Sequence, residues 1–338
     1  MAYTLKLNIY NFSLYRIISS GQRQQRGRVV ITYRTEDTAT GFSDFIRSIN
    51  PNANRDTFVQ ILFTELTNFF NNRFLTNLEG TRAVSITQEP QPRLYSLGYK
   101  IDGMFKGGET GIGRYVYDQS NAVNSNKRIE SSDVPAVSYY YKIWMPYDAE
   151  DGILMVQSYT AMGCVSTFRD QLESFFISHG FKPRWNAIVP DGVMDTYLRN
   201  SVIDEIKIIY AVEQREAQGV FSSMRLAKKE TLIKNLSIPF RQLLQLDNYQ
   251  QELERHIMEF VDYDAVHDMA KVFYTDENGR KASASMADLH DILPSIILPD
   301  NLKVDGTEEP DLNEIASYTD GILENIKHQI GYTVDELQ

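Results

Sequence analysis

The chain opens on two runs in which apolar and polar positions alternate, LKLNIYNFSLYRI from residue 5 and RVVITYR from residue 28. Alternation over this length predicts β-strands, and the polar, glycine-bearing segment SSGQRQQRG between them predicts a hairpin turn. Three arginines, Arg23, Arg26 and Arg28, would lie at or near its tip. We therefore expect an exposed basic loop that makes local contacts with an anionic partner such as nucleic acid.

Apolar positions that recur every three or four residues predict helices over about 56–74, 164–180, 239–260 and 312–330. Asn54 or Asp56 can cap the first of these, and Gly180 is placed to end the second. Pro239 is an acceptable first residue for the third, which is the longest.

Further strands are predicted at RAVSIT, LYSLGYKIDGMF, SYYYKIWMP, GILMVQSYT, RWNAIV and EIKIIYAV, and a short helix over about 194–201 separates the last two. SYYYKIWMP and GILMVQSYT form a hairpin in this prediction. AKVFYTDENGRKASASM forms another, because Asn278-Gly279 is a strong hairpin-turn signal. The predicted fold class is α+β, with mixed or antiparallel β-hairpins packed against amphipathic helices in about two units.

The polar, turn-rich segment DQSNAVNSNKRIESSDVP, residues 118–135, predicts the main domain boundary. On this basis residues 1–117 form an N-terminal α+β unit with the basic hairpin, and 118–135 form a loop or linker. Residues 136–299 form a central α/β unit that contains the long helix 239–260, and 300–338 form an acidic C-terminal helix.

Composition narrows the class of protein. The 338 residues are 42% hydrophobic and include one cysteine, Cys164, which excludes a disulfide within the chain and a zinc site built on several cysteines. The N-terminus lacks the cationic and apolar order of a signal peptide, and the apolar runs are too short to span a bilayer. We therefore expect a cytoplasmic protein without a membrane partner.

Charge is unevenly distributed along the chain. The first 35 residues carry six basic side chains and no acidic one, whereas residues 300–338 carry ten acidic side chains and two lysines. An acidic helix of this kind is most often a solvated face, and less often a docking element or a shield over a basic surface. The net charge of −11 argues against non-specific coating of duplex nucleic acid, although a local basic groove stays open.

The stretch GGETGIGRY, residues 107–115, has the glycine spacing of a phosphate-binding P-loop. A P-loop continues with Lys and then Ser or Thr, which reach the phosphates and Mg²⁺, whereas this chain has Arg114 and Tyr115. A P-loop also opens a helix, and the following YVYDQSNAV predicts a strand. We therefore expect a structural turn between strands and no nucleotide site.

A second pattern is typical of metal chemistry: Pro190-Asp191, thirteen residues, then Glu205-Ile206-Lys207. It resembles the PD-(D/E)XK signature of the restriction-endonuclease-like nucleases. The resemblance implies that Asp191 and Glu205 bind Mg²⁺ and that Lys207 is the catalytic base or an electrostatic partner. It covers about 35 residues. The helix predicted between the motif strands departs from the family pattern and would separate Asp191 from Glu205.

One predicted strand is unusually aromatic and has Lys142 at its centre. Alternation places Tyr140, Lys142 and Trp144 on one face, which we expect to be half-buried under a helix or a partner. The opposite face, with Tyr139 and Tyr141, is expected to lie in the core.

Two functions from different classes follow from these patterns. The leading one is a non-catalytic interaction or assembly subunit without a cofactor, which docks on a protein partner or on a second copy through aromatic and charged surfaces. The alternative is a Mg²⁺-dependent nuclease built on Asp191, Glu205 and Lys207, in restriction or anti-phage defence.

Overall fold

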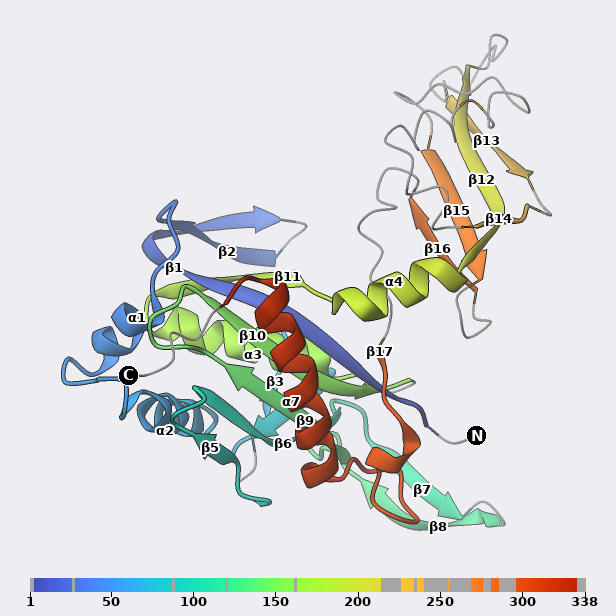
Figure 1. Ribbon diagram of the computed structural model, residues 1–338. Coiled ribbons are helices and arrows are strands. Elements are labelled where there is room, and N and C mark those ends of the chain that lie inside the picture. The colour runs from blue at the N-terminus through green and yellow to red at the C-terminus, as the bar shows by residue number, and fades with distance from the viewer. Residues whose placement is uncertain are drawn as a thin grey trace. The chain divides into compact units, whose positions relative to one another are not determined.

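The computed structural model shows an α+β fold that the contacts divide into two compact units (Figure 1). Unit 1 comprises Met1–Ile188 and Ser295–Gln338, and unit 2 comprises Val189–Pro294. The structure describes residues 3–25, 28–86, 89–118, 121–160, 163–213, 226–233, 236–239, 255, 269–275, 281–285 and 296–332. Every strand pairing among these residues is antiparallel, which confirms the predicted fold class.

Unit 1 is built on one large sheet. Its strands follow the order β11 (Phe181–Ala187), β1 (Leu5–Gln25), β10 (Asp151–Tyr159), β9 (Ala136–Trp144), β6 (Lys100–Glu109), β4 (Arg82–Ile86) and β3 (Leu75–Thr76). β2 (Arg28–Thr35) and β17 (Ile296–Ile297) also pair with β1, and β5 (Arg93–Tyr95) pairs with β6. β7 (Arg114–Asp118) and β8 (Asn121–Ile129) form a separate two-stranded hairpin.

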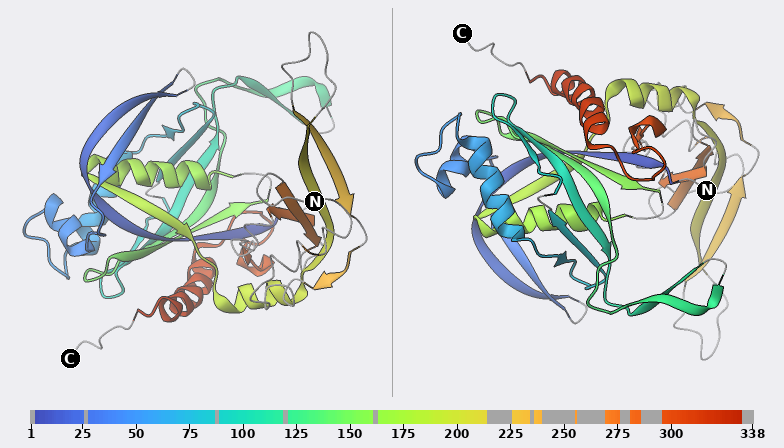
Figure 2. Two further views of the ribbon diagram at one scale, coloured as in Figure 1. Left: turned by 90° about the horizontal axis from the view of Figure 1, so that it is seen from above. Right: turned by 90° about the horizontal axis from the view of Figure 1, so that it is seen from below.

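Helices cover both faces of this sheet (Figures 1 and 2). They are α1 (Phe42–Ile49), α2 (Phe58–Phe70), α3 (Val165–Ser178) and α7 (Leu312–Gln329), and a 3₁₀ turn, η2 (Asp300–Leu302), precedes α7. On one face the ring of Phe168 in α3 stacks on Phe105 of β6, with ring centroids 4.1 Å apart. On the other face the hydroxyl of Thr319 in α7 lies 2.9 Å from that of Tyr140 in β9. The central strands β6 and β9 are therefore buried between α3 and α7.

Among its described residues, unit 2 contains a smaller sheet and the helix α4 (Asp191–Asn200). The strand order is β13 (Leu226–Ile233), β12 (Val202–Glu213), β15 (Met269–Thr275) and β16 (Lys281–Ser285), and β14 (Ile238–Pro239) pairs with β12. The hydroxyls of Tyr197 in α4 and Tyr274 in β15 are 3.0 Å apart, which fixes the C-terminal half of α4 to the sheet.

The domain boundaries differ from those predicted. Residues 118–135 are not a linker, because they contain most of the β7–β8 hairpin. β6 and β9, which lie on opposite sides of that segment in the sequence, pair over nine residues of one sheet, and 296–332 belong to the same unit. A polar segment with turn residues predicts an exposed connection, but it does not reveal whether the strands on either side pair.

The helix predictions need two corrections. The first helix is shorter than 56–74: the carbonyl of Asn54 accepts from the amide of Phe58, and Asn71 ends α2 in the left-handed conformation with φ 46°. Pro239 lies in strand β14 and does not begin a helix. Residues 240–254 and 256–260 of that expected helix lie outside the described residues, and Arg255 between them is helical. α1 was not predicted. α3 and α7 match the helices expected over 164–180 and 312–330 within two residues at each end.

The predicted hairpins of β1–β2, β9–β10 and β15–β16 are confirmed, although the Asn278-Gly279 turn lies outside the described residues. GGETGIGRY is a turn between strands β6 and β7, as expected, with Gly111 at φ +88°. Its first glycines allow close packing: a Cβ on Gly108 would lie 2.4 Å from the carbonyl oxygen of Pro135. These glycines therefore serve the fold of the sheet.

Within the described residues, the structure contains no helix with the length and apolar character needed to cross a bilayer.

Candidate functional site

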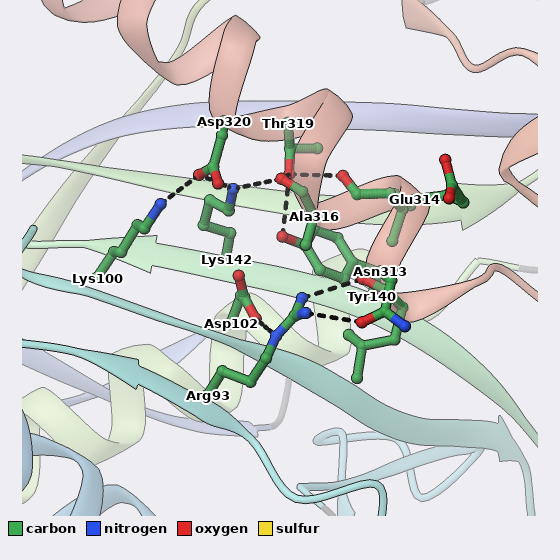
Figure 3. Close-up of polar contacts among 12 residues, drawn as sticks. Arg93, Lys100, Asp102, Tyr140, Lys142, Asn313, Glu314, Ala316, Thr319 and Asp320 are labelled. Atoms are coloured by element: carbon green, nitrogen blue, oxygen red, sulfur yellow. Dashed lines mark hydrogen bonds and ion pairs between the residues drawn. The ribbon is translucent and has the colours of Figure 1, made fainter.

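The contact between α7 and the large sheet contains a buried network of charged and polar side chains (Figure 3). We call this the α7 network, and it consists of Arg93 from β5, Lys100 and Asp102 from β6, Tyr140 and Lys142 from β9, and Thr319 and Asp320 from α7. Buried polar clusters of this kind are candidates for function, because perturbed pKa values concentrate at active and binding sites.

Asp320 is the acceptor that joins two lysines in this network. Its Oδ1 accepts from Lys142 Nζ at 2.5 Å and from Lys100 Nζ at 2.6 Å. Lys142 also donates to the carbonyl oxygen of Ala316 at 3.0 Å, and its side chain is only 1% exposed, whereas that of Asp320 is 39% exposed. The α7 helix thus supplies both acceptors of a buried ammonium group.

The pKa values in the network follow from this geometry. Burial lowers the pKa of Lys142, and the ion pair with Asp320 only partly offsets that effect. Burial also acts to raise the pKa of Asp320, but hydrogen bonds from Lys100 and Lys142 outweigh it and hold the pKa of that carboxyl below its ordinary value. The carboxyl group of Asp320 is therefore charged at neutral pH, and it faces the amino groups of both lysines.

Asp102 forms the second half of the network. Its Oδ1 accepts from Arg93 Nε at 2.7 Å, while its Oδ2 is buried and lacks a hydrogen-bond partner among the described residues. Burial raises the pKa of Asp102, although Arg93 acts in the opposite direction. Arg93 also donates to the carbonyl oxygen of Leu312 and to Asn313 Oδ1, at 3.0 and 3.1 Å. It thereby holds the N-terminus of α7.

The α7 network is an attachment site for a helix. α7 occupies the space above this face of the sheet, and its residues contact the side chains of the network directly (Figure 3). The face of β9 that carries Tyr140, Lys142 and Trp144 is fully buried here, and not half-buried as expected. Its rings are therefore covered by the chain itself. The acidic C-terminal helix covers cationic side chains, which corresponds to the docking or shielding role considered above.

The three residues of the nuclease pattern lie on two consecutive elements of unit 2, α4 and β12. Asp191 is exposed at the first residue of α4, while Glu205 and Lys207 are half-buried near the start of β12. The ten residues of α4, roughly 14 Å of helix, lie between Asp191 and the start of β12, and the C-terminal end of α4 leads directly into that strand (Figure 1). Within the described ranges, no group of three or more His, Cys, Asp or Glu side chains could hold a metal ion.

The basic loop is only partly described. Arg23 is exposed on β1, where it pairs with Val30 of β2. Arg26 lies outside the described residues, and Arg28 begins β2.

The β7–β8 hairpin carries an exposed aromatic and cationic surface that the sequence patterns did not single out. Tyr115 and Tyr117 are 53% and 48% exposed, with ring centroids 6.4 Å apart. Arg128 lies opposite Tyr115 in the hairpin register and its guanidinium is 5.8 Å from the centre of that ring. We call these three residues the hairpin cluster. The alternation of side chains in RYVYD indicates strand β7. Its partner strand, β8, was not predicted, because residues 118–135 were expected to form a loop or linker.

Comparison of the chain with protein-family models, with curated proteins and with solved structures found no match.

Proposed function

We propose that this protein is a non-catalytic assembly subunit and that it docks through the β7–β8 hairpin. The observation that carries the proposal is the hairpin cluster, in which two exposed tyrosine rings and an arginine share one face. Tyrosine and arginine are enriched in protein interfaces, because they combine apolar contact area with hydrogen bonding. Single exposed apolar side chains are common on surfaces, but a grouped pair of rings beside a cation is not.

The backbone of the hairpin supports the same proposal. Among the described strands, β7 and β8 pair only with each other, so each presents one open edge. An open edge is a template for pairing with another strand. An isolated two-stranded hairpin is also marginally stable in water, so that added contacts would stabilise it.

The partner that we propose is a second copy of this chain. Two antiparallel edges can pair about a twofold axis, and a twofold interface uses the same surface on both subunits. The hairpin cluster would then meet its own equivalent. Cys164, a free and buried thiol, is consistent with the reducing cytoplasm that we propose for this assembly.

Sedimentation velocity of the purified full chain over a hundredfold range of concentration tests the proposal. The wild type should show a concentration-dependent dimer, and the double substitution Tyr115→Ser, Tyr117→Ser should weaken dimerisation at least tenfold. Tyr318→Ser is the matched control, since Tyr318 is an exposed tyrosine on α7, away from the hairpin. A wild type that stays monomeric throughout, or a dimer that the double substitution leaves unchanged, would refute the proposed assembly.

A further inference from the structure

A cavity of about 360 Å³ lies between the β7–β8 hairpin and the large sheet. Val116 and Ile129 line it from the hairpin, and Val137 and the ring of Tyr139 line it from β9. Val116 and Ile129 are on the opposite face of the hairpin from Tyr115 and Tyr117, because side chains alternate along a strand. Small-ligand pockets range from roughly 300 to 1,000 Å³ and have mainly apolar walls with a few polar groups. The cavity thus has the size and lining of a site for a small ligand.

The charged groups that line the cavity are two arginines, Arg82 and Arg114, and one carboxylate, Glu109. Arg82 donates through Nη1 to the carbonyl oxygen of Gly163, and no carboxylate among the described residues lies within ion-pair distance of its guanidinium. Since a guanidinium carries five N–H donors, that contact leaves donors for a ligand. A second cation, Arg114, already pairs with Glu109 at 3.1 Å. Arg82 is therefore the charged side chain of the cavity that has no ion-pair partner among the described residues.

Two titratable groups at the cavity do not supply that opposite charge. Burial raises the pKa of the Cys164 thiol and the pKa of the Tyr139 hydroxyl, so both are neutral at physiological pH. A neutral, buried thiol is also a poor nucleophile. The cavity is consequently suited to binding and not to thiolate chemistry.

We infer that this cavity is a binding site for a small apolar carboxylate. The apolar part of the ligand lies against Val116, Ile129 and Val137, and its carboxylate accepts hydrogen bonds from Arg82. Arginine is well suited to this role because its planar fork of donors matches the two oxygens of a carboxylate. The site is independent of the proposed assembly, since it uses the inner face of the hairpin.

Isothermal titration of the purified full chain with octanoate, and separately with octanol, tests this inference. Octanol has the same apolar chain without the charge, so it should bind at least tenfold more weakly than octanoate. Arg82→Gln should weaken octanoate about tenfold and leave octanol unchanged. Arg73→Gln is the matched control, because Arg73 is exposed and lies outside the cavity lining.

Because Arg82 also contacts Gly163, a second variant separates binding from folding. Val116 is 41% exposed, so Val116→Glu should fold normally while placing a carboxylate at the cavity wall, and it should weaken octanoate at least tenfold. Val116→Leu should retain binding. The absence of saturable octanoate binding to the wild type, or binding that neither Arg82→Gln nor Val116→Glu weakens, would overturn the inference.

Discussion

Replacing Asp320 with asparagine should destabilise unit 1 far more than an exposed carboxylate ordinarily does. The substitution keeps the shape of the side chain but removes the charge that faces both Lys100 and Lys142. Lys142 is almost fully buried and would be left with neutral acceptors alone, the carbonyl oxygen of Ala316 and the amide oxygen of the substituted side chain. Breaking a buried ion pair costs roughly 3–5 kcal/mol, and we reduce this to about 2 kcal/mol because solvent screens the partly exposed Asp320.

Urea unfolding followed by tryptophan fluorescence measures this effect. Both tryptophans, Trp144 and Trp185, lie in unit 1, so the signal follows that unit. Trp144 also contacts the C-terminal segment, with its ring 5.3 Å from Nζ of Lys327 in α7 and 4.8 Å from the ring of Tyr332, which follows that helix. A loss of about 2 kcal/mol should lower the urea midpoint by roughly 0.5–1 M.

Two further variants determine whether the buried charge is the cause. Glu324 pairs with Lys327 on the exposed side of α7 at 2.7 Å, so Glu324→Gln should change stability by no more than about 0.5 kcal/mol. Lys142→Met removes the buried charge itself, and the stability should stay within about 1 kcal/mol of the wild type, because burying an ammonium group is costly. The reasoning is refuted if Asp320→Asn costs no more than Glu324→Gln, or if Lys142→Met is the more damaging of the two network variants.

Four other outcomes are expected. Because the folded-state pKa of Asp320 is depressed, its contribution is present above about pH 4 and is lost as the pH falls further, so acid should destabilise the wild type more than Asp320→Asn in parallel unfolding titrations. Gly108→Ala should lower the urea midpoint by the equivalent of about 2 kcal/mol, since its Cβ would overlap a backbone oxygen, whereas Gly321→Ala, in the open middle of α7, should raise stability by about 0.5–1 kcal/mol; equal effects would contradict the packing argument. Purified protein with Mg²⁺ or Mn²⁺ should leave DNA and RNA intact, and metal-dependent cleavage that Glu205→Ala abolishes would establish the nuclease alternative. Replacing Arg23, Arg26 and Arg28 together with glutamine should change the melting temperature by less than a few degrees, because exposed charges contribute little to stability. A large drop in the melting temperature would show that these arginines belong to a buried network.

Local pattern was sufficient to predict the elements whose apolar face is regular. The spacing of Phe168, Leu172 and Phe175 predicts α3, and these side chains are buried in the structure. Hairpins with short turns were equally accessible, because the strands that pair are neighbours in the sequence. These predictions depend only on residues close together in the sequence, and the structure confirms them because contacts with distant segments do not alter these elements.

Pairing between segments that are far apart in the sequence could not be predicted from the sequence. The α7 network joins β5, β6, β9 and a helix more than 170 residues further along the chain, as in the contact of Lys142 with Asp320. Lys142 stood out among aromatic residues, but nothing in the local pattern identified its acceptor. The prediction that a helix begins at Pro239 was wrong for a related reason. A proline that is compatible with the start of a helix is equally compatible with a short strand such as β14. Tertiary pairing decides between such alternatives.

The same two strands connect the α7 network with the cavity under the hairpin. In the register of β6 and β9, Asp102 pairs with Lys142 under α7, and Gly108 pairs with Ala136 at the end that borders the cavity. α7 is thus attached to one end of a strand pair whose other end forms the cavity floor and continues into the β7–β8 hairpin. A buried charged network adds little stability compared with apolar packing, but it requires specific partners and so favours one position of the helix. The acidic C-terminal helix therefore contacts both β6 and β9 near one end of the pair, and the other end leads to the proposed ligand site and the proposed assembly hairpin.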